Sequence, residues 1–120
     1  MNASAWPRFF YRGKVSRVLD GDTVAIHLDL GLDVYHEVTL RLADVNAPEV
    51  VGPERAAGLA AKAWLTDHAI GRDVYVQTLR DKRSFVRYVA LVYLPDDVGT
   101  LESFSDALVA AGHAEWSYRT

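Results

Sequence analysis

The sequence predicts an α+β fold, mainly β: a five-stranded OB-fold barrel with a helix between strands three and four and a C-terminal helix. Three observations indicate this fold class. The first third of the chain alternates apolar and polar residues as strands do, a central segment changes to helical spacing, and two more strand-like segments precede a last short helix. Elements follow each other in this order in such barrels.

The first three strands are predicted at the N-terminal side of the central helix. Residues 9–20 alternate apolar and polar side chains, and Gly13 is expected to mark a bend or a bulge. Residues 23–28 alternate in the same way, which predicts a half-buried strand. The segment 30–33 contains a glycine and is typical of a turn, so a hairpin is expected with a third strand over residues 35–45.

The remaining elements are predicted from a change of periodicity after the third strand. Helical spacing covers residues 53–69, and the proline at its start suits a first helical turn. Its apolar residues recur at helical spacing: Ala56, Leu59, Ala60, Ala63 and Trp64. Strands are expected over residues 73–79 and 87–94. Ser105 is expected to cap a last helix over residues 106–111.

Composition describes an ordinary globular domain with one modest core, since the chain has 120 residues of which 50% are apolar and 24% charged. Cysteine is absent, which excludes disulfides, thiolate metal sites and any cysteine-based partner. The net charge is −3, from thirteen basic and sixteen acidic residues. This balance argues against a generic nucleic-acid coat protein, which would be basic, but leaves room for a local basic patch.

The N-terminal segment has no basic stretch followed by an apolar one, so it does not predict a signal peptide. No segment is apolar enough over the length that a membrane span needs. We therefore expect a cytoplasmic monomer without a membrane partner. Secretion with a leader that has been removed stays an open alternative.

Several short motifs are unremarkable one by one. An Asp-Gly pair makes tight turns, and a glutamate after a proline can be a solvated loop residue. Their combination is more specific: VLDGDTV, then R-L-x-x-V-x-A-P-E, GPE, RYVALVY and DALVAAGHA, in this order. The chain from about Tyr11 to Trp116 thereby resembles the thermonucleases, the staphylococcal nuclease-like family. The resemblance implies that residues 1–120 form a single staphylococcal nuclease-like OB-fold domain.

The resemblance implies a calcium-dependent nuclease that hydrolyses phosphodiester bonds of DNA or RNA by metal-assisted in-line attack of water. Asp22 matches the first calcium-binding aspartate, and Asp20 matches its acidic neighbour. Asn46 stands where the family has a second metal-binding aspartate, and Ala47 stands where it has a threonine whose backbone carbonyl binds the metal. Calcium prefers such hard oxygen ligands.

Three further residues match catalytic positions of the family. Arg41 matches the arginine that contacts the scissile phosphate, and Glu49 matches the glutamate that orients or deprotonates water. Arg87 matches the second arginine, which stabilises charge and assists the leaving group. The residue types suit the reaction, because guanidinium groups grip phosphate oxygens and stay charged, while a carboxylate can accept the proton of a water.

Asn46 leaves two functions open. It keeps an oxygen and loses one charge, so we expect weaker metal binding with the catalytic geometry retained. The alternative is a catalytically weak or inactive nuclease-like domain that binds nucleic acid or a protein. The joint presence of Asp22, Arg41, Glu49 and Arg87 favours the enzyme. Preference for DNA or RNA, and for single or double strands, is not fixed by the sequence.

Overall fold

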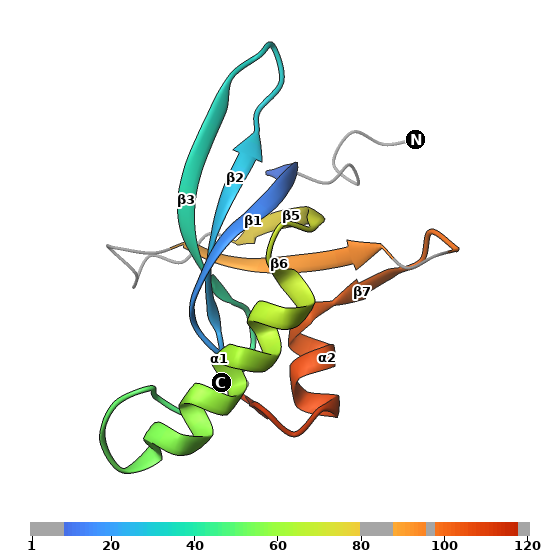
Figure 1. Cartoon of the computed structure of the whole chain (residues 1–120). Coiled ribbons are helices and arrows are strands. Elements are labelled where there is room, and N and C mark those ends of the chain that lie inside the picture. The colour runs from blue at the N-terminus through green and yellow to red at the C-terminus, as the bar shows by residue number, and fades with distance from the viewer. Residues whose placement is uncertain (1–8, 80–87, 96–97, 118–120) are drawn as a thin grey trace.

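The structure is a computed structural model, and it describes residues 9–79, 88–95 and 98–117. Five strands curve into a closed barrel (Figure 1). They are β1 (Phe10–Asp20), β2 (Thr23–Asp29), β3 (Tyr35–Leu42), β5 (Asp73–Leu79) and β6 (Tyr88–Pro95). Their neighbours are antiparallel, except that β3 pairs with β6 in parallel and so closes the barrel. The predicted OB-fold barrel is confirmed.

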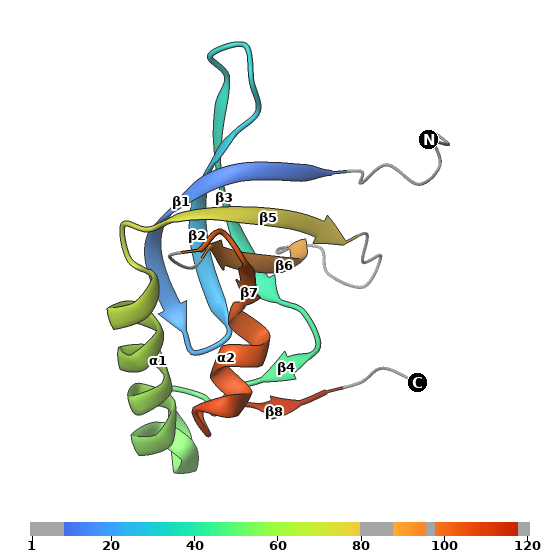
Figure 2. The same cartoon turned by 90° about the vertical axis from the view of Figure 1, so that its right-hand side faces the viewer.

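The other elements extend the barrel at one end and along one edge. They are β4 (Val45–Asn46), the 3-10 turn η2 (Gly52–Glu54), α1 (Arg55–Ala69), β7 (Leu101–Ser103), α2 (Phe104–Ala110) and β8 (Glu115–Trp116). β4 pairs with β8 in a small second sheet, and β7 pairs with β6. Figure 2 shows α1 and α2 at the end of the barrel where β1 finishes and β2 begins. No helix in the described ranges is long and apolar enough to cross a membrane.

The core lies inside the barrel and continues under the two helices. Alternate residues of the strands point inward, and the largest fully buried ones include Ile26, Leu40 and Leu42. Leu65 from α1 and Leu108 from α2 are buried in the same cluster. The helices therefore close the lower end of the barrel with apolar side chains, and this fixes the loops that emerge there.

Gly13 does not mark a bulge, which corrects the expectation from the sequence. The pairing of β1 with β2 is regular through Gly13, and its irregularities lie between Val15 and Arg17 and between Val18 and Asp20. A Cβ atom at Gly13 would lie 2.7 Å from Cγ2 of Ile26. The glycine is therefore required by the close approach of two strands.

The third strand ends at Leu42 and does not continue to residue 45 as predicted. Asp44 adopts a φ of 65°, which breaks the extended backbone, and the chain then enters β4. Buried Ser105 donates a hydrogen bond of 2.7 Å from Oγ to the carbonyl oxygen of Ala43. The break is thus held by a residue far away in the sequence.

The same contact explains why Ser105 is not the helix cap. The N-cap of α2 is Ser103, whose Oγ accepts a hydrogen bond from the backbone N–H of Asp106 at 3.0 Å. Ser105 lies inside the helix and points to the turn after β3. The predicted cap Ser105 is wrong, because its hydroxyl is used by the contact with Ala43 and the helix begins two residues earlier than the prediction.

Of the apolar residues that recur at helical spacing in α1, Trp64 packs against the core, but the fully buried residues are others. Gly58, Ala61, Leu65 and Ala69 are buried, whereas Leu59 is 43% exposed. The alanines that share the predicted stripe are exposed as well: Ala56, Ala60 and Ala63. Small residues dominate the buried face because the helix lies directly against loop backbone, as described below for the candidate site.

Candidate functional site

One open pocket at the helix end of the barrel is lined by Asp22, Arg41, Asn46, Ala47 and Glu49, and its volume is about 590 Å³. These residues are the ones that the sequence motifs predict for the site. Asp20, the expected acidic neighbour, lines the same pocket. Arg87 lies outside the described residues. The barrel therefore gathers side chains from the β1–β2 turn, from β3 and from the loop before α1.

Asp22 is held firmly at the turn between β1 and β2. Its backbone carbonyl accepts a hydrogen bond from the N–H of Leu42 at 2.8 Å, which ties the turn to the end of β3. Its Oδ1 accepts from the hydroxyl of Thr23 at 3.1 Å, and its Oδ2 accepts from the N–H of Ala47 at 3.0 Å. The side chain is 14% exposed. The carboxylate of Asp22 is therefore partly buried and held in one orientation in the pocket.

Arg41 extends from β3 towards the same point. Its Nη2 donates to the carbonyl oxygen of Val45 at 3.1 Å and also to Oδ1 of Asn46. The same nitrogen lies 3.7 Å from Oδ2 of Asp22, with the arginine side chain 25% exposed. The guanidinium is therefore anchored through Nη2, and among the described residues no hydrogen bond is found for its other nitrogen atoms, which can donate to an anion in the pocket.

Asn46 thus uses its side-chain oxygen to orient Arg41. The resemblance to the nuclease family implies that this oxygen binds a metal ion, whereas its hydrogen bond to the neighbouring arginine cannot be deduced from the motif alone. Each carbonyl oxygen has two lone pairs, so contact with Arg41 does not exhaust the acceptor capacity of Asn46.

Glu49 is exposed in the loop that leads into α1. Its backbone N–H donates to Oε2 of Glu54 at 3.3 Å, and Glu54 lines the same pocket. A Cβ atom at Gly58 would lie 2.0 Å from the carbonyl oxygen of Glu49. The position of Glu49 therefore depends on two residues, Glu54 and Gly58, that were not assigned to the site from the sequence. The glycine inside a helical pattern was the signal that could have found the second one.

A second close approach fixes the other half of the site. A Cβ atom at Gly21 would lie 2.7 Å from Cβ of Ala61 and 2.9 Å from Cβ of Ala47. The β1–β2 turn, the loop after β4 and α1 therefore meet without room for larger side chains. This packing brings the N–H of Ala47 within reach of Asp22.

The candidate metal ligands are oxygen atoms, which suit a hard cation, and only one of them belongs to a charged side chain. In the described part of the chain, no three His, Cys, Asp or Glu side chains group as metal ligands. Asp22 would supply the carboxylate, and Asn46 and the Ala47 carbonyl would supply neutral oxygens. Calcium accepts neutral carbonyl oxygens and waters in its shell, so this donor set is chemically compatible with it.

The chain is similar to known nucleases over most of its length. It is 31% identical over 123 residues to the micrococcal nuclease of Shigella flexneri, and the match covers 99% of this chain. The chain spans 64% of the length of that relative. The family described as staphylococcal nuclease homologue matches residues 39–120, which include the end of β3, the loop with Glu49 and both helices. The chain belongs to the staphylococcal nuclease homologue family.

Proposed function

We propose that the protein is a nuclease that hydrolyses phosphodiester bonds of DNA or RNA, with calcium as its cofactor. The observation that carries the proposal is the convergence of Asp22, Arg41 and Glu49 on one pocket from separate elements. Family membership supports the nuclease in general. An anionic substrate that is attacked by water needs these three functions together: cation binding, phosphate binding and proton acceptance.

In the proposed reaction, Arg41 binds a non-bridging oxygen of the scissile phosphate. Its hydrogen bonds to Val45 and Asn46 hold the guanidinium in place before the substrate arrives, so little side-chain freedom is lost on binding. Glu49 accepts the proton of the attacking water, and Glu54 steadies its backbone. Arg87 is proposed, from the sequence motif, to stabilise the charge that develops on the phosphate.

Asp22, Asn46 and the carbonyl oxygen of Ala47 are the proposed calcium ligands. A bound calcium ion would neutralise charge on the phosphate and favour a nucleophilic water. The chain contributes one carboxylate to this set where the family has two, so the proposed affinity for calcium is reduced.

A second function is supported by the contact between Arg41 and Asn46. An arginine that is bound to a neutral amide in place of a metal-binding aspartate is compatible with a domain that holds nucleic acid without cleaving it. This candidate predicts binding that is independent of calcium.

The decisive experiment compares cleavage of single-stranded DNA and RNA in calcium, with and without a chelator. Glu49→Gln and Arg41→Ala should each lower the cleavage rate by about 100-fold or more. Glu102→Gln is the matched control, because this glutamate is exposed on β7 and does not line the site pocket. Retarded nucleic acid without cleavage in any condition would favour the binding domain instead.

A further inference from the structure

The guanidinium of Arg41 lies among oxygen atoms that include proposed calcium ligands. Its Nη2 donates to Oδ1 of Asn46 and lies 3.7 Å from Oδ2 of Asp22. A third oxygen, the backbone carbonyl of Val45, accepts from the same nitrogen at 3.1 Å. Two of these three oxygens belong to the side chains that are proposed to bind calcium. The guanidinium and the proposed metal ion therefore share part of one ligand set.

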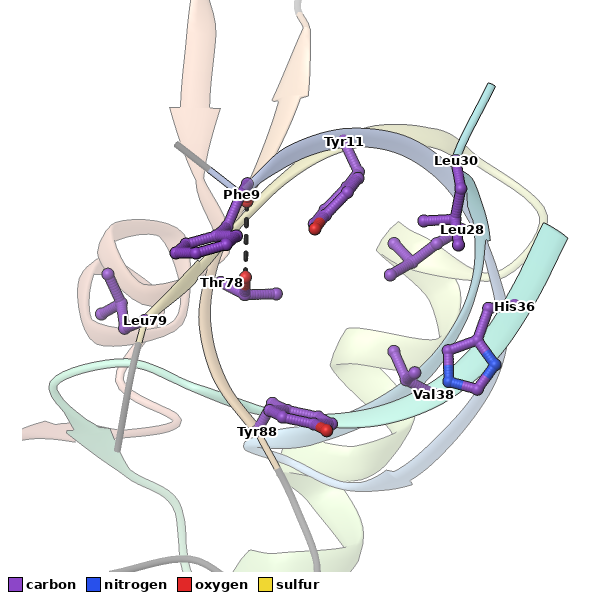
Figure 3. Close-up of a pocket in the computed structure, with 9 residues that line it drawn as sticks. All are labelled: Phe9, Tyr11, Leu28, Leu30, His36, Val38, Thr78, Leu79 and Tyr88. Atoms are coloured by element: carbon purple, nitrogen blue, oxygen red, sulfur yellow. Dashed lines mark hydrogen bonds between the residues drawn. The ribbon is translucent and has the colours of Figure 1, made fainter. Parts of the chain in front are cut away.

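The alternation of β3 explains why the guanidinium reaches this position. Figure 3 looks into the other mouth of the barrel, at a pocket of about 490 Å³, and shows Val38 of β3 pointing into it. Leu40 shares this inward direction and is fully buried. Successive side chains of a strand point to opposite faces, so Arg41 leaves β3 on the outer face. There it pairs with Thr23 of β2, the residue that follows Asp22.

The oxygens around Nη2 are held by the fold, whereas the guanidinium sits at the end of a long side chain. Val45 is fully buried and pairs with Trp116 in the small second sheet. The carboxylate of Asp22 accepts from the N–H of Ala47 at 3.0 Å. The side chain of Arg41 is 25% exposed and can change rotamer towards the open pocket. A cation that binds these oxygens would therefore move the arginine and leave the oxygens in place.

Charge prevents the guanidinium and a divalent cation from holding these oxygens together. Calcium lies about 2.3–2.6 Å from its oxygen ligands. An ion on Oδ2 of Asp22 would thus lie within about 6 Å of Nη2 of Arg41, since 3.7 Å separates this nitrogen from the oxygen. Like charges at such a separation in a partly buried pocket repel each other. Asp22 is the one carboxylate among the three oxygens, and it neutralises a single positive charge.

We propose that Arg41 competes with the metal for these oxygens: either the guanidinium or a divalent cation holds them, and the guanidinium turns towards the phosphate when the cation does. The inference rests on the proposed nuclease function and adds a regulation of the same site. The carbonyl of Val45 is not among the proposed calcium ligands, so its hydrogen bond still limits the freedom of Arg41 after Asn46 has been released. The guanidinium thereby reaches the phosphate only after the metal has entered the site.

The calcium affinity of two variants tests the competition without any cleavage. Arg41→Met removes the competing charge and keeps an unbranched side chain, so calcium should bind about tenfold more tightly than to the wild type in isothermal titration calorimetry. Arg12→Met is the matched control, because it removes the same charge from an exposed position on β1 outside the site pocket and should leave the affinity unchanged. An Arg41→Met variant that binds calcium no more tightly than Arg12→Met would overturn the proposal.

Chemical labelling tests the movement in the wild type, so it does not depend on how a variant folds. Phenylglyoxal modifies accessible guanidinium groups, and peptide mass spectrometry measures the rates at Arg41 and Arg12 in the same sample. Calcium should raise the rate at Arg41 several-fold, because the guanidinium leaves Asp22 and Asn46, and should leave the rate at Arg12 unchanged. A rate at Arg41 that stays the same or falls in calcium would contradict the competition.

The same titrations distinguish this inference from the proposed function. Equal calcium affinity in the wild type and both variants would contradict the competition and leave the proposed nuclease function in place. If neither the wild type nor the variants bind calcium, calcium as the cofactor and the competition are both wrong. Calcium binding to Arg41→Met alone would support the competition and would show that Arg41 excludes the metal from the wild-type site, as the candidate that holds nucleic acid without cleavage predicts.

Discussion

Arg41 and Asn46 form the pair of side chains that most affects the chemistry of the site. The asparagine oxygen accepts from the same Nη2 that lies 3.7 Å from Asp22. A carboxylate at position 46 would face both this guanidinium and any cation at Asp22. The neutral amide therefore lowers the negative charge of the site while it keeps the arginine in place.

Asn46→Asp should tighten calcium binding by about tenfold, because ligand charge is a main determinant of calcium affinity. Isothermal titration calorimetry measures this directly. Gln77→Glu adds the same charge on β5, away from the site pocket, and should leave the affinity unchanged. Equal affinity in Asn46→Asp and the wild type would mean that residue 46 is not a metal ligand.

At the scale of elements, α1 positions the loop that carries Glu49, because small residues of the helix leave room for the loop backbone. Gly58 is buried where the carbonyl oxygen of Glu49 approaches the helix, and Ala61 is buried against Gly21. A glycine inside a helix costs about 1 kcal/mol relative to alanine. Glycine occurs at position 58 despite this cost, because no larger residue fits beneath the loop.

Gly58→Ala should therefore destabilise the protein by about 1–3 kcal/mol, although helix propensity alone predicts a gain. Cleavage should fall as well, because the loop that carries Glu49 must move. Urea unfolding and initial rates measure the two effects. Ala63→Gly, on the exposed side of α1, should cost only about 1 kcal/mol and keep the activity. A more stable and fully active Gly58→Ala would show that the loop adapts freely.

The two serines of the last helix should also behave differently. Ser103→Ala removes an N-cap and should cost about 1 kcal/mol without affecting the site. Ser105→Ala leaves the carbonyl of Ala43 without its buried donor and should cost about 1–3 kcal/mol. Since Ala43 precedes the turn to β4, Ser105→Ala should also raise KM. Identical KM values in both variants would show that Ser105 does not support the site.

At the scale of the whole molecule, net charge limits how nucleic acid is held. A chain of net charge −3 is not basic overall, so we expect its affinity for nucleic acid to come from few phosphate contacts. Additional affinity is then expected from uncharged contacts.

Binding of single-stranded DNA should consequently depend only moderately on salt. Two phosphate contacts give a slope of about −1.4 in a plot of log affinity against log salt. Fluorescence anisotropy with Glu49→Gln in place of the wild type would measure it without cleavage. A slope steeper than about −4 would reveal a larger basic surface, for example one that includes residues 80–83.

The sequence determined the order of the elements and the chemistry of the site. Alternation and helical spacing depend on neighbouring residues, so the five barrel strands and α1 were predicted close to their observed bounds, and the strand 73–79 matches β5. Asp22, Arg41, Asn46, Ala47 and Glu49 were predicted from the resemblance of short motifs to those of the nuclease family. The structure brings these residues to one pocket.

Only the tertiary structure decided which side chains and which segments contact each other. It showed that Asn46 holds Arg41, that Ser105 supports the turn after β3, and that α1 buries its small residues. None of these contacts can be predicted from the periodicity of the sequence, because each depends on the path of the backbone in three dimensions. The pocket at the far mouth of the barrel arises in the same way, from strand ends that are adjacent in space and far apart in the chain.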